Sequence, residues 1–149
     1  MLMALILGTV TVALTMGIQV FAVVFMLKWL IAYLNEHQLA PGFKVDAYVL
    51  AIVLTVMFVG HILQIAIWAL LFLLLTEFAD FATAFYHSAV NFASLGYGDI
   101  VMSERWRLLG ALEASNGVLM FGLTTGTLIT IMNRVFSRNK GRFEKLKED

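Results

Sequence analysis

The chain has 149 residues, of which 61% are hydrophobic and only 13% are charged. Soluble globular domains average about 45 to 50% apolar and about 25% charged residues, so this composition excludes an ordinary soluble protein. Ten basic and ten acidic residues give a formal charge of zero, which does not favour nucleic acid as a partner, and the absence of cysteine excludes disulfides, Cys-ligated metals and thiol chemistry.

The first predicted element is an uncharged apolar stretch over residues 2–27, long enough to cross about 30 Å of hydrocarbon as a helix. It lacks the basic start of a secretory signal, and no small-residue cleavage site follows it before Lys28. We therefore expect a retained transmembrane helix within residues 1–34, placed outermost and facing lipid. Residues 35–46 are predicted to form a cytoplasmic loop.

The second predicted span covers residues 47–76, with His61 and Gln64 as its only strongly polar members. These two residues share a helix face, where interhelical hydrogen bonding to the first span is preferred over proton sensing. The apolar stretch within residues 80–93 would be only about 20 Å long as a helix, which is too short to cross. We expect it to enter the membrane, with Asp80 as its N-cap, and to turn back.

The re-entrant helix is followed at once by the sequence SLGYGD, residues 94–99. Aiming several consecutive carbonyl groups at one axis requires alternate residues in left-handed conformations, which glycine adopts without steric cost. Gly96 and Gly98 have this spacing, and the Ser94 hydroxyl adds an oxygen at the inner end. Four such strands would surround a dehydrated cation with oxygen rings, and the C-terminal end of the re-entrant helix would add negative potential there.

Residues 85–99, FYHSAVNFASLGYGD, resemble the pore helix and signature filter of tetrameric potassium channels, usually written T-V/I-G-Y-G-D. The resemblance implies an all-α membrane protein with three transmembrane helices, assembled as a homotetramer around a central pore. The implied pore domain, residues 47–133, comprises an outer helix (47–76), a pore helix (80–93), a filter (94–99) and an inner helix (107–133). The implied filter residues are Ser94, Leu95, Gly96, Tyr97 and Gly98, with K+ as permeant ligand at the first four, no other cofactor, and Asp99 as the outer carboxylate.

Three positions depart from the family pattern. Ser94 replaces the usual threonine and Leu95 replaces a β-branched residue that braces the strand, so a looser filter could also tolerate sodium. Val90 stands where many members have a glutamate that pairs with the filter aspartate, which leaves the partner of Asp99 open.

The third apolar stretch, residues 108–133, contains one acid, Glu113, at roughly the depth of the pore helix. We expect Glu113 to pair with His87 or Tyr86 behind the filter. Two interpretations of the pair are open: a structural hydrogen bond that supports the filter, or a pair whose protonation changes conduction with pH.

Four further residues of the third span are candidates for function. Gly117 and Gly122 indicate either a hinge that lets inner helices splay open or tight helix packing. Asn116 is expected to line the cavity below the filter or to contact a neighbouring helix, and Thr124 to line the cavity or bond its own helix. No span has basic residues at three-residue spacing, so the sequence contains no voltage-sensing helix of the usual kind.

The remaining residues, 134–149, form a tail with six basic side chains, which we expect to lie against anionic lipid headgroups. With this tail in the cytoplasm, eight basic residues lie inside and two outside, as the positive-inside rule favours. The N-terminus is then outside. We expect an integral protein of a prokaryotic plasma (inner) membrane, with the lipid bilayer and further copies of itself as partners and no nucleic acid.

The leading functional hypothesis is a homotetrameric potassium-selective channel that conducts passively. The first alternative is a weakly selective monovalent cation channel on the same scaffold. The second is a non-conducting membrane subunit that retains a pore-like fold. Enzyme chemistry has no support, because no nucleophile with its base and no metal-ligand cluster appears at a usable spacing.

Overall fold

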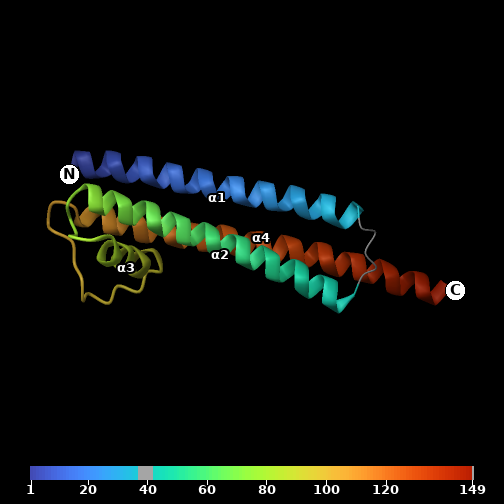
Figure 1. The fold of residues 1–149 in the computed structure, drawn as a ribbon. Coiled ribbons are helices and arrows are strands. Elements are labelled where there is room, and N and C mark those ends of the chain that lie inside the picture. The colour runs from blue at the N-terminus through green and yellow to red at the C-terminus, as the bar shows by residue number, and fades with distance from the viewer. Residues whose placement is uncertain (37–41, 149) are drawn as a thin grey trace.

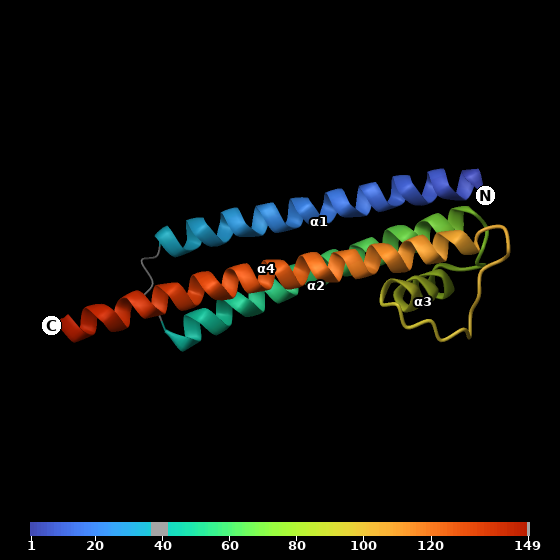
Figure 2. The same ribbon diagram turned by 180° about the vertical axis from the view of Figure 1, so that it is seen from behind.

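The computed structural model describes residues 1–36 and 42–148, which form four helices and no strand. These helices are α1 (Leu2–Glu36), α2 (Phe43–Leu74), α3 (Phe81–Phe92) and α4 (Arg107–Glu148). Figure 1 shows α1, α2 and α4 running side by side along one long axis, with the short α3 held at the end where the N-terminus lies. The view from behind gives the same arrangement (Figure 2).

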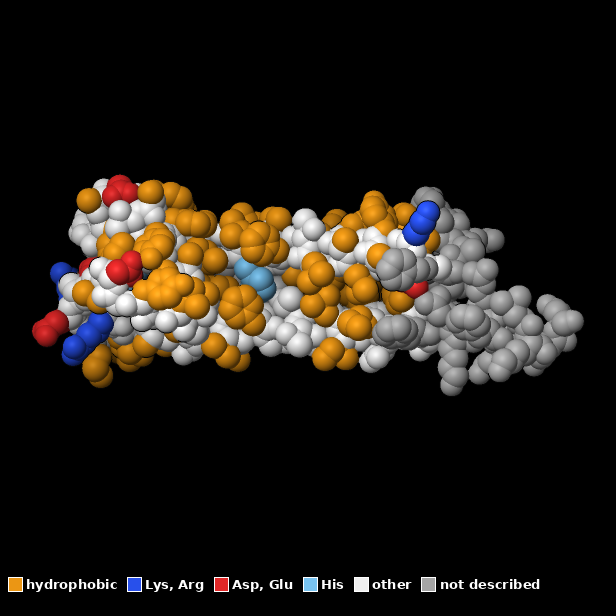
Figure 3. Space-filling view, turned by 90° about the horizontal axis from the view of Figure 1, so that it is seen from below, with side chains coloured by type: hydrophobic (Ala, Val, Ile, Leu, Met, Phe, Trp, Pro, Cys, Tyr) orange, Lys and Arg blue, Asp and Glu red, His pale blue; other side chains and the backbone are white. Residues whose placement is uncertain are grey.

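Three stretches are long and apolar enough to cross a membrane: Leu2–Tyr33, Lys44–Leu74 and Arg107–Val135. The three predicted spans are therefore confirmed, as is the all-helical fold. The surface has the distribution expected of a membrane protein: hydrophobic side chains cover much of the visible face along its length, while the charged side chains gather toward the two ends (Figure 3).

The helix bounds differ from the predicted ones by more than two residues at two places. α2 begins at Phe43, ahead of the predicted start at residue 47, with Asp46 in its first turn where a negative charge complements the helix dipole. α4 does not end at residue 133 but continues as a helix to Glu148, since no proline interrupts it. Part of the predicted 35–46 loop, residues 37–41, lies outside the described residues, as do the side chains of the basic tail beyond Ser137.

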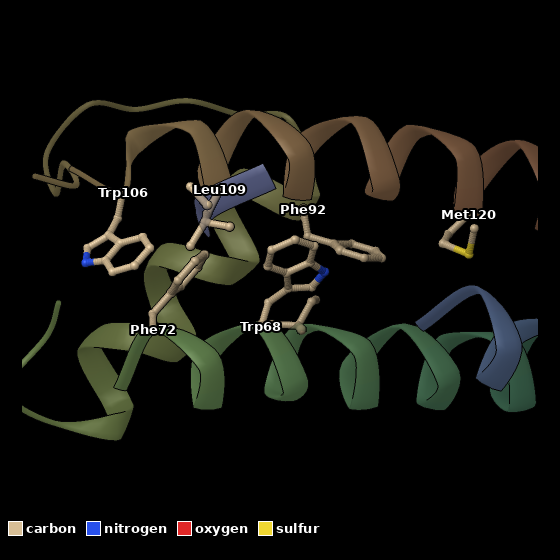
Figure 4. Packing of buried hydrophobic residues seen from close by; sticks show 8 residues of the cluster. Trp68, Phe72, Phe92, Trp106, Leu109 and Met120 are labelled. Carbon is tan, nitrogen blue, oxygen red and sulfur yellow. The ribbon is translucent and has the colours of Figure 1, made fainter. Parts of the chain in front are cut away.

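Two buried hydrophobic clusters hold the helices together, one toward each end of the bundle. The cluster beside α3 joins all four helices (Figure 4) and contains Ala4, Ile65, Trp68, Phe72, Phe92, Trp106, Leu109 and Met120. The other cluster joins α1, α2 and α4 and contains Met26, Leu30, Val49, Val53, Met57, Ile131 and Val135. α1 packs along both α2 and α4, and a Cβ at Gly8 would stand 2.4 Å from the Leu112 side chain, so the first span is part of the core and not only a lipid-facing addition.

A set of polar side chains, here called the polar seam, links α1, α2 and α4 between the two clusters. Its members are Thr15 and Gln19 of α1, His61 and Gln64 of α2, and Asn116 and Thr124 of α4. The Gln64 Nε2 donates to Gln19 Oε1 at 2.6 Å, so the predicted bonding of Gln64 to the first span is confirmed. The ring of His61 instead contacts α4, where its Nε2 lies 3.1 Å from the Thr124 hydroxyl.

The polar seam also corrects the expectation that Asn116 and Thr124 line a cavity. Asn116 is 1% exposed, and its Nδ2 donates to the Thr15 hydroxyl at 2.9 Å, which places it inside the subunit. The Thr124 hydroxyl meets Gln19 Nε2 at 3.3 Å as well as the His61 ring, so it is directed at α1 and α2. Contact with a neighbouring helix, the alternative considered for Asn116, is the observed one.

Candidate functional site

The short helix α3 is fixed at its start by a side-chain cap. Asp80 accepts hydrogen bonds from the Thr83 backbone N–H at 2.9 Å and from the Thr83 hydroxyl at 2.8 Å, which confirms the predicted N-cap. Ala84, Ser88 and Phe92, spaced four residues apart, are fully buried and form the face that packs against the long helices. α3 therefore has a defined rotation, and its last residue, Phe92, sits in the core.

The inner helix meets the end of α3 at Gly117. A Cβ at this position would stand 1.9 Å from the Phe92 carbonyl oxygen and 2.8 Å from its carbonyl carbon, so only glycine allows the approach. Of the two interpretations of Gly117, tight packing is the one that the contacts support. Gly122 has nothing within 4 Å of a built Cβ among the described residues, and its role as a hinge stays a prediction.

The segment after α3 has the alternating backbone that the glycine spacing predicted. Gly96 and Gly98 have φ values of +59° and +75°, and Ser94 joins them at +57°. The Ser94 N–H donates to the Asn91 carbonyl at 2.8 Å and the Leu95 N–H donates to the Val90 carbonyl at 2.9 Å, which is the hydrogen-bond pattern of a Schellman helix end. Such a helix end requires a residue in the left-handed conformation, and here that residue is Ser94. The end of α3 therefore places the first of the three left-handed residues, although it is not a glycine.

The outer carboxylate Asp99 has a partner that the sequence did not reveal. The Tyr86 hydroxyl donates to its Oδ2 at 2.8 Å, and Tyr86 lies one turn before Val90 on the same helix. The partner of Asp99 in this structure is therefore a tyrosine of α3. This hydrogen bond holds the pKa of Asp99 below its ordinary value and raises the pKa of Tyr86 above its own.

A second carboxylate, Glu77, holds the loop that follows residues 94–99. Its Oε2 accepts from the Ser103 hydroxyl at 2.9 Å, and its Oε1 accepts from the Ser103 backbone N–H. Glu77 is placed by the turn that ends α2, in which Thr76 is left-handed (φ 55°) and the Glu77 N–H donates to the Phe72 carbonyl at 3.0 Å. Sequence reasoning missed this contact, because the two residues are 26 positions apart.

Glu113 does not form the predicted pair with His87 or Tyr86. It is 0% exposed, and its carboxyl group faces the polar side chains of Ser88 and Asn91 of α3. Tyr86 is bonded to Asp99 instead. The prediction was wrong about the partner because the rotation of α3, fixed by its buried face, turns Ser88 and not Tyr86 toward α4.

His87 also has partners other than Glu113. Its Nδ1 is 3.2 Å from the Ile100 carbonyl oxygen and its Nε2 is 2.8 Å from the Asn91 Nδ2. Phe72 and Phe78 pack against the ring, with centroid separations of 5.7 Å and 4.8 Å. His87 therefore connects α3 to the segment that leaves the filter.

The segment from Ser94 to Gly98 has a backbone that can direct several carbonyl oxygens to one side. A left-handed residue at every second position is the conformation that turns successive carbonyls toward one side, and α3 ends immediately before it, which adds the negative end of a helix dipole. All the residues from Ser94 to Asp99 are exposed in the single chain, so this strand has open space beside it.

Comparison with known proteins agrees with this geometry. No solved structure matches the chain. A family model described as "Ion channel" matches residues 49–134, which comprise most of α2, the whole of α3 with the segment after it, and the apolar part of α4. α1 lies outside the matched range. Because this match covers more than half of the sequence, the chain belongs to this ion-channel family and is an integral membrane protein.

Proposed function

We propose that the protein is a potassium-selective channel in which four copies assemble one filter around a shared axis and conduct K+ passively. The observation that carries the proposal is the alternation of left-handed residues at Ser94, Gly96 and Gly98 directly after the end of α3. Backbone oxygens of Ser94, Leu95, Gly96 and Tyr97, repeated in each copy, would replace the hydration shell of the ion.

Assembly from several copies is supported by what a single chain leaves uncovered. Each chain contributes one strand, and oxygen rings need several strands. α4 also has an exposed face that points away from its contacts with α1 and α2 and combines several small residues with Val118 and Ile129. This face includes Ala111, Ser115, Gly122, Thr125 and Gly126. Small residues let helices approach closely in a membrane, so the face suits packing against further copies around the axis.

The orientation proposed from the basic residues has support from the arrangement of the ends. The N-terminus and α3 lie at one end of the bundle, while the C-terminus lies at the other (Figure 1). A cytoplasmic basic tail therefore puts the filter and the N-terminus on the outer side. We propose the plasma membrane of a prokaryote as its location, with anionic lipid contacting the tail.

The test is ion flux through the purified protein in liposomes, with reversal potentials measured in mixed potassium and sodium. A reversal potential that follows the potassium gradient is expected. A value near zero would replace the proposal with the weakly selective cation channel, which the shorter side chain of Ser94 and the unbranched β-carbon of Leu95 would favour. Assembled tetramers without flux would replace it with the non-conducting subunit.

Gly96→Ala is the variant that should lose potassium flux, and Gly17→Ala is its matched control. The φ of +59° is left-handed, where a residue with a Cβ costs about 1 to 2 kcal/mol, and the strain recurs in every copy. We expect the variant to lose potassium flux and to remain tetrameric, as judged by size-exclusion chromatography with light scattering. Gly17→Ala in α1, where a Cβ meets nothing within 4 Å, is the control and keeps its flux.

A further inference from the structure

The hydrogen bonds around His87 define its protonation state. The Ile100 oxygen, 3.2 Å from Nδ1, is a carbonyl and can only accept, so Nδ1 carries the hydrogen. The Asn91 Nδ2, 2.8 Å from Nε2, can only donate, so Nε2 has none. His87 is therefore held as one neutral tautomer between two fixed partners, and it is 6% exposed.

We propose that His87 is a proton-operated switch behind the filter, and that it acts on the inner helix through Asn91. The proposal rests on the channel function proposed above. A proton arriving from solution binds Nε2, and the new N–H then faces the N–H of Asn91. Two donors cannot bond, so the Asn91 amide must turn over or move away, while the bond from Nδ1 to Ile100 remains.

The position of Asn91 transmits this change to α4. Its Nδ2 lies 3.0 Å from the point where a Cβ at Gly110 would stand, so the amide rests directly on the inner helix. The Asn91 amide also faces the buried carboxyl group of Glu113, one turn further along α4. Any reorientation of the amide therefore changes the polar surroundings of a buried carboxyl group. The first observable consequence is a change at Asn91 itself.

The charged groups around His87 decide where it titrates. Burial lowers the pKa of His87 below its ordinary value. The hydrogen bond to Ile100 and the carboxylates of Glu77 and Asp99 raise this pKa, but burial has the larger effect. Arg107 lines the same open pocket, of about 480 Å³. This pocket lets protons from solution reach the ring of His87. Because the pKa is lowered, the ring becomes protonated only at acidic pH.

The direction of the effect follows from charge. A protonated His87 places a positive charge behind the strand that would coordinate K+, and like charges repel more strongly in a medium of low dielectric constant. Acid is therefore expected to reduce flux several-fold. His61 is the internal comparison, because its Nε2 meets a hydroxyl that can act as donor or acceptor, and protonation there forces no rearrangement.

The experiment measures potassium flux in liposomes at about pH 8 and about pH 5, equal on both sides, for the wild type, His87→Gln and His61→Gln. The wild type and His61→Gln should lose flux several-fold in acid, whereas His87→Gln should not. An equal acid response in all three would overturn the switch.

Solid-state NMR of the wild type supplies a readout that needs neither flux nor a variant. The side-chain ¹⁵N signal of Asn91 should move together with the His87 ring signals across the titration. A static Asn91 signal while His87 titrates would overturn the switch, whatever the flux. Wild-type tetramers that conduct at no pH would remove the proposed channel function instead, and the Asn91 signal would still decide the switch.

Discussion

Gly117→Ala tests the close contact between α4 and the end of α3, directly ahead of the proposed filter. Helical glycine to alanine changes are ordinarily stabilising by roughly 0.5 to 1 kcal/mol. Here the added Cβ would stand 1.9 Å from the Phe92 carbonyl oxygen, and real Cβ contacts are essentially never under 3.0 Å, so the two backbones must separate by at least 3.0 − 1.9 = 1.1 Å. Overpacking of this kind costs about 1 to 3 kcal/mol, which exceeds the gain.

The same displacement should reach the filter. Phe92 is the last residue of α3 and lies two residues before Ser94. Because protein interiors are closely packed, a displacement of Phe92 is passed on to its neighbours. We expect a lower thermal unfolding midpoint in detergent together with lost potassium flux in liposomes. Gly17→Ala makes the same chemical change where a Cβ meets nothing within 4 Å, and should keep both properties. Wild-type stability and flux in Gly117→Ala would refute the close approach of α4 to Phe92.

Two further substitutions test contacts made by side chains. Tyr86→Phe removes the hydrogen bond that lowers the pKa of Asp99, so a carboxyl ¹³C titration should show that pKa rising toward its ordinary value. The lowered pKa of Asp99 stabilises the wild-type fold at pH values above the pKa of an unfolded aspartate, and this contribution disappears as the pH falls through the pKa in the folded state. The variant lacks this contribution, so its stability should fall less in acid than that of the wild type. Identical titrations of the two proteins would contradict the contact. Gln19→Leu removes the hydrogen bonds to Gln64 and Thr124. Because a typical interhelical hydrogen bond contributes about 0.6 kcal/mol, the variant should be destabilised by about 1 to 2 kcal/mol, as measured by denaturant titration. Thr55→Val, whose hydroxyl bonds only its own helix, is its control and should be near neutral.

The candidate site was predictable to the extent that its features are local in sequence. The N-cap at Asp80 and the left-handed conformation of Gly96 and Gly98 follow from residue type and spacing, and the structure has them. The left-handed Ser94 arises from the way α3 ends, a hydrogen-bond pattern that residue type alone does not signal. Tyr86 was predicted to support the filter, but its partner was wrong.

Contacts between distant segments escaped prediction for a different reason. Glu77 and Ser103 are far apart in the chain, and neither belongs to a motif. The polar seam joins residues of α1 to residues of α4, and the sequence offered only a choice of faces for Asn116. A periodic pattern tells which residues share a helix face, but not which neighbour that face meets.

The sequence by itself determined the number and order of the helices, and which of them is too short to cross. Hydrocarbon thickness and the need to satisfy backbone hydrogen bonds act on each stretch locally, so composition is enough. Only the tertiary structure decided the rotation of each helix about its own axis. That rotation is set by close packing, as where Gly117 meets Phe92, and it determines that Asp99 bonds Tyr86 while Glu113 faces Ser88 and Asn91.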